Sequence, residues 1–289
     1  MHSGSMTIPA VKLGVFIVPD ATHRAATVEQ IIEAERCGLD IVGVQDHPYQ
    51  WRFFDTWTLL AYGAGRTERV RLIPDVLNLP LRSPTLIAKS VASLDVLSDA
   101  RVELGIGAGA FWDGVVAMGG PRRTPKESVD ALEEALAILR GFWSGERSVS
   151  FEGEHYRVKG AHPGPSPAHP VGIWLGAYGP RMLSLTGRLA DGWLPSLGRN
   201  YLTAADAAKA HAAIDEAARR AGRDPAKIER AVNVMALDGE SPSWPDQLAR
   251  IASELRFSTL LVAVPPDDPI AFVRRLGEDT APRVRRLLR

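Results

Sequence analysis

The residues best suited to chemistry follow the second strand-like segment, in the run Val44-Gln45-Asp46-His47-Pro48-Tyr49-Gln50-Trp51. Apolar residues give way there to a carboxylate, an imidazole and an indole. A histidine can move a proton near neutral pH, the adjacent carboxylate can bond a cofactor, and an aromatic face can bound a planar ring. The alternative interpretation is a strand-end turn in which Asp46 caps a helix and His47 is an ordinary surface group. The other segments of the chain have to decide between these two interpretations.

Two glycine-rich segments suit a phosphorylated cofactor. Residues 105–109 read Gly-Ile-Gly-Ala-Gly, and Gly179-Pro180-Arg181 opens a predicted helix. Glycines let backbone N–H groups approach an anion, a helix N-terminus adds partial positive charge, and an arginine offers a forked donor. The alternative for residues 105–109 is close packing of a strand. A Rossmann fingerprint is excluded, because Ala110 stands where its third glycine would fall and no helical pattern begins at once.

The elements that would position these segments are predicted from an alternation of strand-like and helix-like patterns along the chain. The predicted strands cover residues 13–19, 40–46, 70–78, 101–109, 172–178, 191–196, 228–237 and 258–265. The clearest helical periodicity covers residues 27–37, 84–97 and 126–143, and a last helix is expected near 269–277. Eight such units predict an α/β fold, a (β/α)8 TIM barrel, formed as a single domain by residues 6–289. Residues 148–158, with a turn at Gly153, predict a β-hairpin inserted before the fifth strand.

The composition narrows the class of protein. Lysine plus arginine equals aspartate plus glutamate at 34 each, so no net charge draws the chain to nucleic acid or anionic lipid. Cys37 is the only cysteine, and no H-E-x-x-H spacing occurs, so neither a disulfide nor a metal site is expected. The opening residues 1–5 resemble a vector remnant. The start lacks the hydrophobic core typical of a signal peptide and no apolar run reaches membrane-spanning length, so neither feature is expected. A cytoplasmic enzyme with a small-molecule substrate is the expectation.

In a TIM barrel the carboxyl ends of the strands surround one mouth. Polar or glycine-rich groups follow the second, third, fourth and fifth predicted strands, at residues 46–47, 75–78, 105–113 and 176–181. Their convergence on one site is a stronger indication of function than any one of them. By contrast, Glu133 and Glu134 lie on a predicted helix and are expected to form a solvated face.

Several motifs together resemble those of the luciferase-like monooxygenase family, over about residues 12–193. They are Val76-Leu77-Asn78-Leu79-Pro80-Leu81-Arg82-Ser83-Pro84, the glycine run 105–109, Trp143-Ser144-Gly145-Glu146 with residues 151–156, the segment 176–181, and Ala190-Asp191-Gly192-Trp193. The resemblance implies a (β/α)8 barrel that binds FMN or the deazaflavin coenzyme F420 at its carboxyl-terminal mouth. Asp46, His47 and a tryptophan five places after the aspartate are similar to the deazaflavin branch, whereas FMN enzymes more often carry a Glu-His-His pattern.

The same resemblance implies roles for individual residues. His47 would transfer the proton, Trp51 would flank the reacting carbon, and Asp46 would bond the ring system. A non-prolyl cis peptide bond is expected between Asp75 and Val76, as a buttress behind the ring. The resemblance also implies one substrate contact, at Arg199. The remaining implied cofactor contacts are Asp75, Val76, Asn78, Ala108, Gly109, Asp113, Ala177, Tyr178, Gly179 and Arg181.

One departure from the family pattern limits the substrate. A sugar-phosphate dehydrogenase of the deazaflavin branch carries a glutamate where this chain has Ala110, so its second acid–base group is absent. This argues against a sugar-phosphate substrate. Three functions follow: an F420-dependent oxidoreductase of a small organic substrate, an FMN-dependent monooxygenase using reduced flavin and dioxygen, and a flavin-binding protein without catalysis. The first is favoured, and a homodimer is expected.

Overall fold

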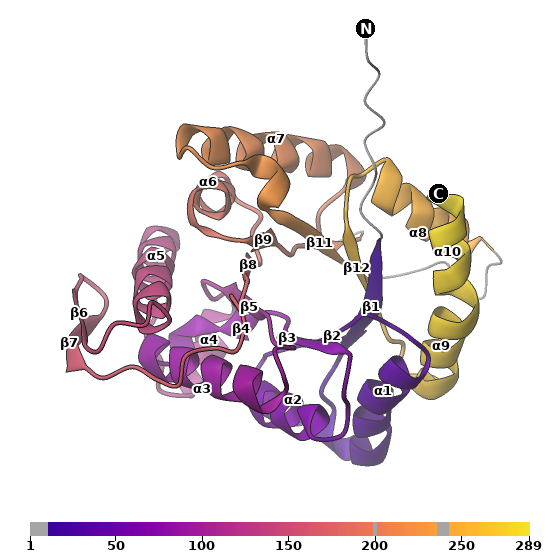
Figure 1. The fold of residues 1–289 in the computed structure, drawn as a ribbon, viewed down its shortest axis with the longest axis horizontal. Coiled ribbons are helices and arrows are strands. Elements are labelled where there is room, and N and C mark those ends of the chain that lie inside the picture. Colours follow the sequence, from indigo (N-terminus) through magenta and orange to yellow (C-terminus); the bar gives the residue numbers. More distant parts are fainter. Residues whose placement is uncertain (1–10, 199–200, 236–242) are drawn as a thin grey trace, which may run out of the picture.

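Parallel strands close into a ring with helices packed around its outside, in a computed structural model that describes residues 11–198, 201–235 and 243–289 (Figure 1). The expected vector remnant lies outside the described residues. The strands of the ring are β1 (Lys12–Ile17), β2 (Ile41–Val44), β3 (Arg71–Pro74), β4 (Leu77–Asn78), β5 (Leu104–Gly107), β8 (Ile173–Leu175), β9 (Gly192–Trp193), β10 (Ser196–Leu197), β11 (Glu229–Val234) and β12 (Thr259–Ala263).

The strand order confirms the predicted barrel. Hydrogen-bonded neighbours follow the order β3-β2-β1-β12-β11-β9-β8-β5-β4, and β10 pairs with β11. The two ends of this order meet, because Leu72 of β3 forms a parallel bridge with Val102 and accepts a 3.0 Å hydrogen bond from the Glu103 N–H group. Since β4 continues β3 and β10 continues β9 along the chain, the described strands occupy the eight positions that the sequence predicted.

Helices follow the strands and cover the barrel (Figure 1). They are α1 (Arg24–Arg36), α2 (Thr56–Ala64), α3 (Pro84–Leu97), α4 (Trp112–Ala117), α5 (Pro125–Phe142), α6 (Pro180–Leu189), α7 (Ala204–Arg220), α8 (Trp244–Ser253), α9 (Pro269–Arg275) and α10 (Ala281–Leu287). Local chemistry fixes the starts of several of them, since α3, α5 and α6 each begin at a proline, whose missing N–H group costs nothing there. Within the described ranges, no helix combines the length and apolarity needed to cross a membrane.

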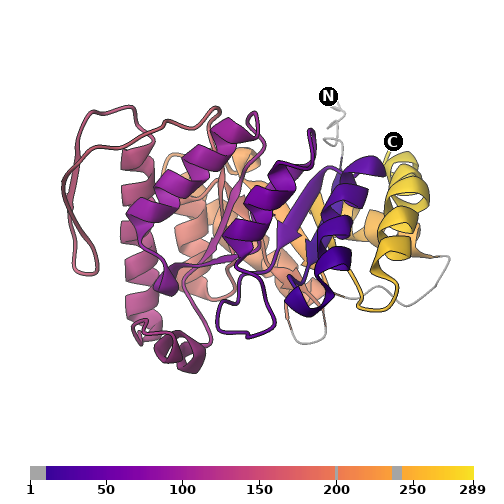
Figure 2. The ribbon, with the colours of Figure 1, turned by 90° about the horizontal axis from the view of Figure 1, so that it is seen from below.

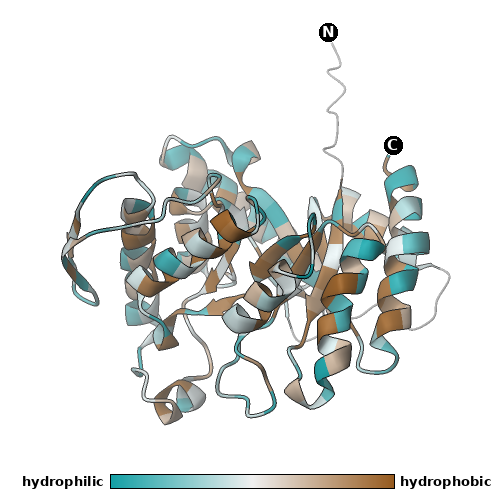
Figure 3. Cartoon of the chain, turned by 60° about the horizontal axis from the view of Figure 1, so that its bottom comes forward, coloured by the Kyte–Doolittle hydropathy of each residue, from teal (hydrophilic) through white to brown (hydrophobic). Residues whose placement is uncertain are grey.

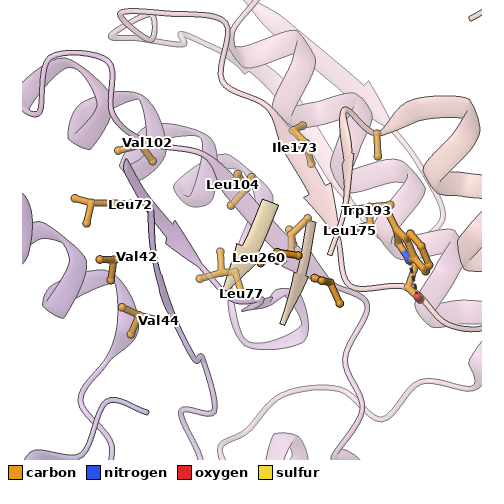
Figure 4. Packing of buried hydrophobic residues seen from close by; sticks show 14 of the residues in the cluster. Val42, Val44, Leu72, Leu77, Val102, Leu104, Ile173, Leu175, Trp193 and Leu260 are labelled. Atoms are coloured by element: carbon orange, nitrogen blue, oxygen red, sulfur yellow. Dashed lines mark hydrogen bonds between the residues drawn. The ribbon is translucent and has the colours of Figure 1, made fainter. Parts of the chain in front are cut away.

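Buried side chains form two layers. Leu72, Leu104 and Leu175 belong to the larger cluster, which also contains helix residues such as Ile87 and Leu132 and therefore fills the space between sheet and helices (Figure 4). The smaller cluster comes from alternate strand positions, whose side chains point into the barrel. Its buried members are Phe16, Ile41, Ile73, Trp174, Leu194, Ala231 and Leu261. Hydrophobic residues accordingly run along the strands, while the helices carry both kinds of residue (Figure 3). The inner cluster therefore fills the interior of the barrel with apolar side chains below the mouth.

A two-stranded hairpin projects from the side of the barrel between α5 and β8 (Figure 2). It is formed by β6 (Val149–Glu152) and β7 (Arg157–Ala161), which pair antiparallel. The Glu134 carboxylate of α5 accepts hydrogen bonds from the backbone N–H groups of Glu154, His155 and Tyr156 at 2.7–2.9 Å. The expectation that Glu134 belongs to a solvated face is therefore wrong, because this side chain fastens the hairpin turn to the helix.

Candidate active site

A cavity of about 690 Å³ opens at the carboxyl ends of the barrel strands. Its size falls within the range of small-molecule and cofactor sites. The strand ends that the sequence predicted to meet do surround it. The predicted site residues that line it are Asp46, His47, Asp75, Val76, Asn78, Ala108, Gly109, Tyr178, Gly179 and Arg181.

His47 lies half-buried on the wall that follows β2. Its ring stacks on Tyr49 with 5.4 Å between ring centroids, and Tyr49 in turn contacts Phe111 at 5.1 Å. Burial lowers the pKa of His47 below its usual value, while the nearby Asp46 charge acts in the opposite direction. The imidazole is therefore neutral at neutral pH, which is the form that can accept a proton.

Asp46 is buried beside His47 and is held by the protein itself. Its carboxylate accepts a 2.8 Å hydrogen bond from the Asn78 N–H group and a 2.9 Å bond from Arg82. The same guanidinium reaches Asp55 at 2.7 Å, and it is Asp55, not Asp46, that caps α2. The helix-cap interpretation of Asp46 is thus wrong. Asp46 fixes the end of β2 to β4 and contributes a carboxylate edge to the cavity.

The Asp75–Val76 peptide bond is cis, which confirms the expectation drawn from the family resemblance. The two side chains of this dipeptide occupy space that glycines leave free. A Cβ atom built on Gly176 would lie 2.9 Å from Val76 Cγ2, and one built on Gly43 would lie 2.6 Å from Asp75 Oδ2. Glycine at these strand positions is therefore required for the inner edge of the cavity to have this shape.

Asp75 is the most unusual ionisable group of the site. It is 4% exposed, and its Oδ1 atom accepts a 2.8 Å hydrogen bond from Asn233 Nδ2. Its Oδ2 atom has no hydrogen-bond partner among the residues that the structure describes. Burial raises the pKa of Asp75 to about 7, although the hydrogen bond from Asn233 acts to lower it. A carboxyl group with such a pKa can carry a proton under physiological conditions.

Another part of the cavity lining combines two cations with a helix N-terminus. Lys126 and Arg181 both line the cavity, and both bind Asp130, at 2.7 and 2.6 Å. The N-cap residue of α6, Gly179, provides no side-chain cap, whereas α5 is closed by a capping box of Thr124 and Glu127. The first N–H groups of α6 are therefore the ones left for a ligand.

Three predicted site residues, Trp51, Asp113 and Ala177, do not line the cavity. Trp51 is 85% exposed and lies against Arg52, with the guanidinium 5.9 Å from its ring centroid. Asp113 is exposed and pairs with Arg122. Ala177 is buried, and its carbonyl accepts a 2.9 Å hydrogen bond from Trp193 Nε1. Arg199 lies outside the described residues. Strand-end side chains alternate between inside and outside, so adjacency in sequence to a cavity residue did not guarantee a place in the cavity.

Several lining residues were not predicted from the sequence. They are Lys126, Ser196, Tyr201, Asn233 and Met235 among others. Asn233 and Met235 follow the rule that strand ends face the mouth, so closer attention to the seventh predicted strand could have found them. Lys126 had no such signal, because it lies on a helix and reaches the cavity only through the packing of α5 beside α6.

Comparison with known proteins identifies the family to which the chain is similar. The sequence profile described as luciferase-like monooxygenase matches residues 11–255. The F420-dependent glucose-6-phosphate dehydrogenase of Intrasporangium calvum is 33% identical over 217 residues, covering 72% of this chain and 64% of that relative. The match therefore spans slightly less than two thirds of the relative's length.

Solved structures share the fold. An F420-dependent secondary alcohol dehydrogenase in complex with an F420-acetone adduct superposes with a TM-score of 0.82 at 18% identity, covering 95% of this chain and 99% of that one. The oxygenating constituent of 3,6-diketocamphane monooxygenase from Pseudomonas putida, in complex with FMN, gives a TM-score of 0.75 at 18% identity, with the same coverage of 95% and 99%. These two structures agree with the barrel described above.

Proposed function

Because the chain belongs to the luciferase-like monooxygenase family, we propose that it is an oxidoreductase that binds coenzyme F420 and passes a hydride between this coenzyme and a small organic substrate. The name of the curated relative as an F420-dependent dehydrogenase supports the choice of cofactor. The observation that carries the proposal is the cavity, which is lined by His47 and by the two cations Lys126 and Arg181. The cofactor supplies the hydride chemistry when it is bound, while the protein supplies position, exclusion of water and a proton.

The residues present fit such a cofactor. The uncapped start of α6, with Arg181 and Lys126, can hold a phosphate group. On the inner edge, Asn78 Oδ1 is buried without a hydrogen-bond partner among the described residues. Buried polar atoms in proteins are rarely left unpaired, so an acceptor of this kind fits a ring that carries an N–H group.

His47 is the proton-transfer residue of this proposal. In the oxidation of an alcohol, the neutral imidazole accepts the hydroxyl proton as the adjacent carbon gives up its hydride, and in the reverse direction it returns that proton. The lowered pKa of His47 keeps the accepting form populated at neutral pH. Arg82 and Asn78 hold the neighbouring Asp46, which orients the end of β2 that carries the histidine.

The proposed substrate is a small organic molecule other than a sugar phosphate. Ala110 lines the cavity and brings no carboxylate to it. Lys126 and Arg181, the cations that line the described part of the cavity, lie on the wall assigned to the cofactor phosphate. A homodimer and a cytoplasmic location remain predictions, as do the contacts expected for Asp113, Ala177 and Arg199.

The FMN-dependent monooxygenase is kept as the second candidate because of one observation. Trp51 was part of the spacing that favoured the deazaflavin, yet its side chain is exposed and does not line the cavity. The non-catalytic alternative is less well supported, because His47 does lie in the cavity.

Spectroscopic titration of the purified protein with F420 and with FMN tests the proposal. We expect F420 to bind and FMN to bind much more weakly; tight binding of FMN alone would reject the deazaflavin. With a substrate found by screening small alcohols and ketones, His47→Ala should lower kcat by about 10²- to 10⁴-fold. His23→Ala, at an exposed histidine of the helical turn before α1, is the control and should leave kcat unchanged.

A further inference from the structure

The floor of the cavity carries an acid and an amide that hydride and proton transfer at His47 do not use. Asp75 and Asn233 are 4% and 3% exposed, and both line the cavity. Each keeps one buried oxygen, Asp75 Oδ2 and Asn233 Oδ1, without a hydrogen-bond partner among the described residues. Two unpaired oxygens at one place, on side chains that contact each other, indicate that the floor is completed by a ligand.

The surroundings of this pair are neutral. Asn233 Nδ2 donates to Asp75 Oδ1 at 2.8 Å and lies 3.5 Å from Ser196 Oγ, and the Ser196 N–H group donates to the Tyr178 hydroxyl at 2.8 Å. The packed neighbours on β2 and β12 are Gly43 and Leu261. The other ionisable groups that line the same cavity are Asp46, His47, Tyr49, Lys126, Tyr178, Arg181 and Tyr201. Within the described residues no cation bonds Asp75, since Arg82 is bound to Asp46 and Asp55.

An ionised Asp75 is therefore poorly stabilised. A buried carboxylate needs a cation or several donors to offset its desolvation, and Asp75 has a single bond from a neutral amide. In agreement, burial raises the pKa of this carboxyl to about 7. The protonation state changes what the floor presents: the neutral acid offers a donor at Asp75 beside the acceptor at Asn233, whereas the ionised acid leaves acceptors only.

We propose that Asp75 and Asn233 form a hydrogen-bonding subsite for the ring of the bound cofactor, and that only the protonated form of Asp75 completes it. The inference rests on the function proposed above, which places a flat heterocycle in the cavity. A deazaflavin or flavin ring carries both N–H and carbonyl groups and so matches a floor with one donor and one acceptor. Cofactor affinity then depends on one proton held by this carboxyl.

Binding measured as a function of pH tests this inference. The dissociation constant of F420 should be followed by its fluorescence from about pH 5.5 to about pH 9. For the wild type we expect the affinity to fall towards a limiting slope of about tenfold per pH unit once Asp75 ionises, as required when binding takes up one proton. Asp75→Asn keeps the shape and a donor but cannot ionise, so its affinity should lack this fall. Asn233→Ala removes a bond that lowers the pKa of Asp75 and should move the fall to higher pH.

The controls separate this inference from the proposed function. The cofactor's own titration is common to all variants, so only the difference between wild type and Asp75→Asn reports on Asp75. The exposed Asp267→Asn should behave as wild type. If F420 binds with the same pH dependence in Asp75→Asn as in wild type, the subsite is overturned while the proposed function stands. If neither F420 nor FMN binds the wild type, the proposed function fails and the subsite fails with it.

The ionisation of Asp75 also has a readout that needs no cofactor. Carboxyl ¹³C signals of the ligand-free protein, assigned by their loss in Asp75→Asn, should titrate near neutral pH. A midpoint in the ordinary aspartate range, below about pH 5, would overturn the inference whatever binds.

Discussion

The Asp75 carboxyl, which we propose for cofactor binding, is expected to lower the stability of the folded protein when it ionises. Its pKa is raised to about 7 in the folded protein, so between about pH 4 and about pH 7 the folded state holds a proton that the unfolded chain releases. The free energy of unfolding should therefore fall as pH rises through this window. Asp75→Asn removes the penalty, and we expect it to be more stable than wild type at about pH 8 by at most roughly 4 kcal/mol. Urea unfolding of both proteins measures the difference.

Measurements at low pH provide the control for Asp75→Asn. Below about pH 4 the carboxyl is protonated in both folded and unfolded chains, so the two proteins should then have nearly equal free energies of unfolding. A variant that is less stable than wild type at alkaline pH would show that Asp75 is stabilised as an anion. Sites that bind ligands commonly keep such unfavourable groups, because the ligand satisfies what the fold leaves unpaired.

The first turns of α5 and α6, which line the cavity through Lys126 and Arg181, lead to a prediction about cofactor binding. Arg181 lies in the first turn of α6, which has no side-chain cap, and it lines the cavity with Lys126 of α5. Arg181→Ala should weaken F420 binding by about tenfold or more and reduce its dependence on salt, because a charge-assisted bond to the phosphate is lost. Titration at low and high ionic strength measures both effects. Arg188→Ala is the matched control, since Arg188 belongs to the same helix but pairs with Glu133. An equal loss in both variants would mean that the effect comes from the helix and not from the anion site.

Elements whose pattern is local could be predicted from the sequence. The apolar period and the prolines at helix starts predicted α3 over residues 84–97, where the structure also has it, and strand ends with polar or glycine residues did meet at one mouth. What failed depended on packing between distant segments. The sequence pattern alone suggested that Glu134 is a surface residue, whereas in the structure it accepts a hydrogen bond from the hairpin turn twenty positions later. Trp51, two residues beyond the cavity residue Tyr49, is exposed, and Lys126 lines the cavity only because α5 lies beside α6.

The cavity is lined by residues from most of the strand positions of the barrel. Residues of β1, of β5 and of the ends of β2, β3, β8 and β11 contribute to one wall or another. A ligand bound there contacts elements that are far apart in the sequence but joined through parallel hydrogen bonds. The hairpin of β6 and β7 is different. It pairs only with itself among the described strands, is fastened to α5 through Glu134 and contributes no residue to the lining of the cavity.

Cofactor binding should therefore stabilise the barrel as one unit and leave the hairpin unaffected. At about one hundred times the dissociation constant, F420 should raise the free energy of unfolding by about 2.7 kcal/mol, which shifts Tm by several degrees in a chain of this size. Hydrogen exchange should slow in the barrel strands, while amides of residues 149–161 exchange at the same rate with and without F420. Thermal unfolding and exchange measured by mass spectrometry test the two halves separately. Asp75→Asn at alkaline pH should show the larger cofactor-induced shift, because it needs no proton to bind. Slowed exchange in the hairpin would contradict the separation of the two elements, and an unchanged Tm at saturating F420 would contradict binding in the folded barrel.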